Sequence, residues 1–190
     1  MGISQPQILT AHRDGDGGMK LKRNFDAVAA WGVTVTLAYF LTPAMSFLNI
    51  SAINIHYQIL TMWTLLMAVP IYMSYQEGKG PLGWKTLNPI WAAFMIIGLV
   101  GNFAGQLFLT GESLIFSYFH KWFLLPGVLF IYTSYKMSDL SRKIYGAAAV
   151  LNIMAVLLLA VEPVFQIYAF PTAAVIQGMP MIADWYVRKK

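Results

Sequence analysis

Long apolar runs alternate with short polar stretches along the whole chain. Five runs have about the 20 mostly apolar residues that a helix needs to cross a bilayer, and a sixth, 167–182, is shorter and contains two prolines. The six runs are 27–48, 55–75, 89–110, 114–135, 145–164 and 167–182. The pattern predicts an all-α, polytopic integral membrane protein built as a six-helix transmembrane bundle. Five spans plus an interfacial helix at 167–182 is the alternative.

The polar ends of the chain lie outside this apolar region. Residues 1–24 are polar and rich in glycine, and we interpret them as an N-terminal cytoplasmic tail. A single transmembrane helical domain is expected over 25–187, followed by a basic C-terminal tail at 188–190.

Basic residues favour the six-span topology. Twelve of the thirteen lie in four places: the N-terminal tail, the loops after the second and fourth runs, and the C-terminal tail. These places share one side of the membrane only if the sixth run crosses it. Cytoplasmic loops are enriched in Lys and Arg, so we expect both termini to be cytoplasmic.

Composition supports membrane insertion and excludes some chemistry. The chain is 58% hydrophobic and 11% charged, with a mean hydropathy of +0.59, so a soluble domain would have too few polar residues to cover its surface. Because there is no cysteine, disulfides and thiolate metal ligands are excluded. The net charge of +5 is explained by topology, and no nucleic-acid partner is expected.

Polar residues that are costly to expose to lipid gather toward the predicted outer side, six of them inside the apolar runs and Glu112 in the turn between the third and fourth runs. They are His56, Asn102, Gln106, Glu112, His120, Lys121 and Glu162. Ionisable groups at membrane depth are costly, so they are candidates for a functional role.

Two cofactor hypotheses use these residues. His56 and His120 lie on predicted helices of the same direction and could ligate haem b from both sides. Alternatively, His56 and His120 with Glu112 or Glu162 could hold a transition metal. The sequence does not decide whether any cofactor binds.

A packing interpretation competes with both hypotheses. The histidines then stabilise helix contacts, and Lys121 points toward water or pairs with Glu112 or Glu162. Gly101 and Gly105 form a small-xxx-small pattern, which favours close contact between helices. Asn102 and Gln106 then hydrogen-bond across that contact, or else they line a ligand path.

The functional prediction follows from size and from missing motifs. The sequence contains no known catalytic motif, so a non-catalytic role is favoured over a stand-alone enzyme. We expect a small multi-span subunit or accessory protein of a larger membrane complex, whose partners are the lipid bilayer and other subunits or further copies of the chain. A redox subunit using His56 and His120, and a small transporter, are the alternatives.

Overall fold

The structure is a computed structural model that describes residues 26–48, 55–76 and 82–188, and every regular element in these ranges is helical. The first three rods are α1 (Ala27–Leu48), α2 (Ile55–Gln76) and α3 (Leu82–Phe108). The fourth rod consists of α4 (Gly111–Tyr118) and α5 (His120–Lys136), and the fifth is α6 (Asp139–Val161). The last rod comprises the 3-10 helix η1 (Pro163–Tyr168), α7 (Ala169–Ala173), the π-helix η2 (Ala174–Gly178) and α8 (Met179–Arg188).

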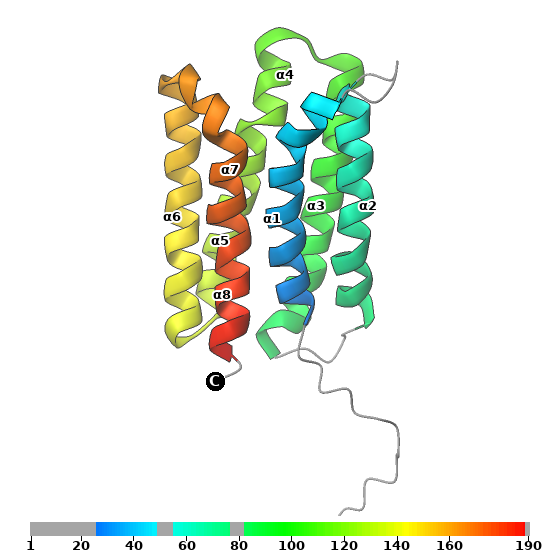
Figure 1. The fold of residues 1–190 in the computed structure, drawn as a ribbon. Coiled ribbons are helices and arrows are strands. Elements are labelled where there is room, and N and C mark those ends of the chain that lie inside the picture. Colours follow the sequence, from blue (N-terminus) through cyan, green and yellow to red (C-terminus); the bar gives the residue numbers. More distant parts are fainter. Residues whose placement is uncertain (1–25, 49–54, 77–81, 189–190) are drawn as a thin grey trace, which may run out of the picture.

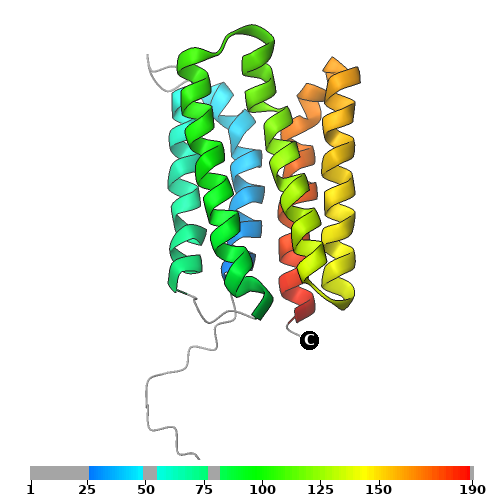
Figure 2. The ribbon, with the colours of Figure 1, turned by 180° about the vertical axis from the view of Figure 1, so that it is seen from behind.

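Successive rods run in opposite directions, side by side (Figures 1 and 2). The start of α1 and the end of α8 therefore lie at the same end of the bundle, which we call the terminal end. The opposite end carries α4, and we call it the α4 end.

The prediction of an all-helical protein is confirmed for the described residues. In this part of the chain, three segments are long and apolar enough to cross a membrane: Ala27–Met45, Pro89–Phe108 and Asp139–Val161.

Three helical rods differ from the expected segments. Helix α3 begins at Leu82 instead of residue 89, and Leu87 in its added turns is fully buried. The fourth rod is interrupted at Phe119, and the last one continues to Arg188. Apolar runs predict helices but not these details, because burial against other helices extends a helix beyond its apolar run.

Helix α1 packs against α2, α7, η2 and α8, while α5 packs against α6. Gly32 and Gly178 lie where α1 meets η2. A Cβ on Gly178 would be 2.8 Å from the carbonyl oxygen of Gly32, so glycine allows the two backbones to touch here. Small residues permit this close approach of helices in apolar surroundings.

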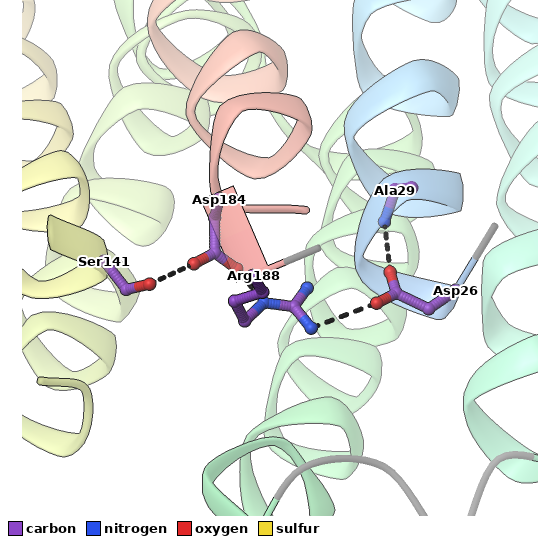
Figure 3. A network of polar contacts seen from close by, with 5 residues as sticks. All are labelled: Asp26, Ala29, Ser141, Asp184 and Arg188. Carbon is purple, nitrogen blue, oxygen red and sulfur yellow. Dashed lines mark hydrogen bonds and ion pairs between the residues drawn. The ribbon is translucent and has the colours of Figure 1, made fainter. Parts of the chain in front are cut away.

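A polar network joins three helices at the terminal end (Figure 3). Asp184 of α8 is fully buried and accepts hydrogen bonds from Ser141 of α6 and from Arg188 Nε, the latter at 2.8 Å. Arg188 also donates to Asp26 at 3.0 Å. Asp26 in turn accepts a hydrogen bond from the backbone N–H of Ala29 and thereby caps α1.

We expect Arg188→Ala to destabilise the protein by roughly 3 kcal/mol, because the buried carboxylate of Asp184 loses its charged partner. The melting temperature in detergent measures this change. Lys143→Ala, which removes an exposed cation from α6, is the matched control. Equal melting temperatures for the two variants would contradict the structural role of the network.

Candidate functional site

A cavity of about 170 Å³ lies between the helices toward the α4 end. Its aromatic wall consists of Tyr39, Trp63, Phe119, Trp122 and Phe170. The polar residues that line it are Thr42, His56 and Asn102. Helices α1, α2, α3, α5 and α7, together with the break at Phe119, all contribute, so the cavity depends on the assembled bundle.

The rings of the aromatic wall contact one another, and the polar atoms of two of them are hydrogen-bonded inside the protein. Trp63 stacks on Trp122 with a centroid distance of 5.7 Å, and Tyr39 meets Trp63 edge-on at 4.7 Å. Trp63 Nε1 donates to Thr42, and the Tyr39 hydroxyl donates to Gln177, both at 3.0 Å. The wall therefore offers mainly apolar ring surface to a ligand.

Gln177 of η2 supports this wall from behind. Pro126 has no N–H group, so the carbonyl of Trp122 lacks the usual helical donor four residues ahead. Gln177 Nε2 replaces that donor at 2.8 Å and also donates to Asn152 Oδ1 at 2.9 Å. The side chain of Gln177 thus fixes the backbone that carries Trp122 and the hydroxyl of Tyr39.

Lys121 of α5 binds Asn102 across the contact between α5 and α3. Its ammonium group donates to Asn102 Oδ1 at 2.5 Å, to the carbonyl of Gly98 at 3.2 Å and to Ser117 Oγ at 3.4 Å. These acceptors use all three donors of a lysine. A Cβ on Gly101 would be 3.2 Å from Lys121 Nζ, so the glycine leaves room for the ammonium group.

The sequence suggested Glu112 or Glu162 as the ion-pair partner of Lys121. Glu162 is exposed, and its carboxylate accepts a hydrogen bond from the backbone N–H of Val164 at 3.4 Å. The side chain of Glu112 lies outside the described residues. Among the described side chains, no carboxylate forms an ion pair with Lys121.

The two histidines are placed differently with respect to the cavity. His56 lies in the first turn of α2 and lines the cavity. His120, at the start of α5, is not part of the lining; its ring stacks on Phe116, and its buried Nδ1 has no partner among the described residues. Gln106 is half-buried on α3 and is also absent from the lining.

No group of three or more His, Asp or Glu side chains suited to a metal ion occurs within the described ranges. The predicted sets, His56 and His120 for haem and the same pair with Glu112 and Glu162 for a metal, stay predictions. The placement of the described histidines adds no support to either set.

Sequence reasoning missed the roles of Tyr39, Gln177 and Asp184. One signal for Gln177 was available: an amide in an apolar run can satisfy the carbonyl that a proline such as Pro126 leaves free. For Asp184, the signal was Arg188 four residues later, on the same face of a helix.

Gly101→Leu is expected to lower the melting temperature in detergent, because the added side chain would displace Lys121 from Asn102 and Gly98. Ala104→Leu adds an apolar side chain on the exposed face of the same helix and is the control. If both variants melt like the unmodified protein, the contact between α3 and Lys121 does not stabilise the fold.

No family model, characterised protein or solved structure matches the chain.

Proposed function

We propose that this is a small integral membrane protein with six spans that holds a small, largely apolar ligand in the cavity. It acts as an accessory subunit or carrier for that ligand within a larger membrane complex, not as a stand-alone enzyme. The observation that carries this proposal is the cavity of about 170 Å³ with its aromatic wall.

The size and lining of the cavity fit a ligand of one ring. Protein interiors are close-packed, so an unfilled space of this size leaves its lining side chains without the contacts that they make elsewhere in the core. An apolar cavity of about 150 Å³ is large enough to bind benzene. A ring that enters the cavity gains contacts with the aromatic wall.

The exposed surface supports insertion of all six rods. Each rod exposes large apolar side chains: Phe40, Leu65, Ile97, Ile131, Leu157 and Val175 are one example from each rod. Such broad apolar exposure suits lipid or partner helices better than water.

The distribution of charge supports an orientation with the terminal end in the cytoplasm. The basic residues of the loops and tails lie toward that end in sequence, and cytoplasmic loops are enriched in Lys and Arg. In this orientation the cavity lies in the outer half of the bundle.

The two other functional hypotheses gain less from the placement of their residues. Of the residues of a transporter path, only Asn102 lines the cavity; the others are Gln106, His120, Lys121 and Glu162. A redox site at His56 and His120 has only His56 there.

Six spans predict that both termini are on the cytoplasmic side. In right-side-out vesicles, a protease added outside should leave a C-terminal epitope tag intact, and permeabilised vesicles serve as the digestion control. Cleavage of the tag in sealed vesicles would contradict the six-span topology.

Filling the cavity should abolish ligand binding. Benzene should raise the melting temperature of the unmodified protein, because a ligand that binds only the folded state stabilises it. Leu99→Phe inserts a ring from a lining position and should remove that rise. Leu107→Phe, at an exposed position of the same helix, should keep it, so an equal rise in both variants would exclude the cavity as the binding site.

A further inference from the structure

The cavity contains one buried polar group whose hydrogen-bonding capacity is not used up inside the protein. Asn102 lines the cavity and is only 4% exposed. Its Oδ1 accepts the hydrogen bond from Lys121, and for its Nδ2 no acceptor occurs in the described part of the chain. The amide NH₂ group is therefore available to a molecule in the cavity.

The contact with Lys121 determines the orientation of the Asn102 amide group. An ammonium group can only donate, so the oxygen of Asn102 must face Lys121 and the nitrogen must point elsewhere. Lys121 itself is not part of the cavity lining. Because its other two donors are bound to Gly98 and Ser117, Lys121 is a positioning residue that holds the amide in one orientation.

Other lining hydroxyl groups already use their donors. The Thr42 hydroxyl donates to the carbonyl of Ala38 at 2.8 Å, and the Tyr39 hydroxyl donates to Gln177. The N–H groups of Asn102 are different, since no described residue accepts a hydrogen bond from them and they are available to a molecule in the cavity. A ligand with an acceptor oxygen satisfies these donors, whereas a purely apolar ligand covers them without a hydrogen bond.

We infer that the ligand is a single-ring compound with a carbonyl or similar acceptor oxygen, which accepts a hydrogen bond from Asn102 Nδ2 while the ring lies against the aromatic wall. This inference rests on the proposed ligand-binding function and adds the class of ligand. Such a ring carbonyl could be the head group of a membrane lipid, as in a quinone, or a free small molecule.

Two probes of the same shape test the inference. Acetophenone has a ring and a carbonyl, and α-methylstyrene replaces the carbonyl oxygen with a CH₂ group. By calorimetry in nanodiscs, corrected with empty nanodiscs, we expect acetophenone to bind on the order of tenfold more tightly, as one net hydrogen bond allows. The infrared band of its ¹³C-labelled carbonyl should shift to lower wavenumber on binding.

Asn102→Asp is the decisive variant. The carboxylate keeps the shape of the side chain and the contact with Lys121, but it has no N–H to donate. The preference for acetophenone and the infrared shift should both disappear. Gln106→Glu makes the same chemical change one helical turn away, outside the cavity lining, and should keep both.

A second variant covers the case that Asn102→Asp does not fold. Lys121→Met removes the group that orients the amide, so the preference for acetophenone should fall while α-methylstyrene binds as before.

Acetophenone with a decyl chain on the ring distinguishes the two sources of ligand. Tighter binding than that of the tailless probe indicates a lipid head group, and weaker binding indicates a free molecule. Either result supports the ring-carbonyl inference.

The outcomes separate this inference from the proposed function. Equal affinities for acetophenone and α-methylstyrene in the unmodified protein would overturn the role of Asn102 and leave ligand binding in place. Failure of both probes, and of benzene, to bind would overturn the proposed function itself.

Discussion

The ammonium group of Lys121 lies within a bundle of apolar helices, and such a charge is tolerated only if its hydrogen bonds are satisfied inside the protein. The neutral oxygens of Gly98, Asn102 and Ser117 supply three acceptors. This requirement shapes the contact between α3 and the fourth rod, since Gly101 leaves the space that the ammonium group occupies. It also fixes the orientation of Asn102, so the polarity of the cavity follows from a residue outside its lining.

The same constraint applies to the other buried polar groups. The Trp122 carbonyl, which Pro126 leaves without its helical donor, is satisfied by Gln177 of η2. Asp184 is satisfied by Ser141 and Arg188. In each case at least one partner comes from a different rod, so these polar contacts help to align the rods.

The helical fold could be predicted from the apolar runs because run length and hydropathy are local properties. The ends of the helices and the site could not, because they depend on contacts between distant parts of the chain. Asp184 lies beyond the sixth run, yet it is fully buried and accepts a hydrogen bond from Ser141, 43 residues earlier. Asn102 was recognised as either a helix contact or part of a ligand path. In the structure its Oδ1 contacts Lys121 and the residue lines the cavity, an arrangement that depends on Lys121, 19 residues later.

Affinity and selectivity have separate origins in this arrangement. The aromatic wall supplies apolar surface, so it favours any ring of suitable size with little regard to its substituents. The single oriented amide adds only about 1 kcal/mol of net hydrogen bonding, but a ring without an acceptor leaves that buried donor unpaired and is disfavoured. Discrimination between ligands of the same shape therefore depends on Asn102, and through it on the lysine behind it.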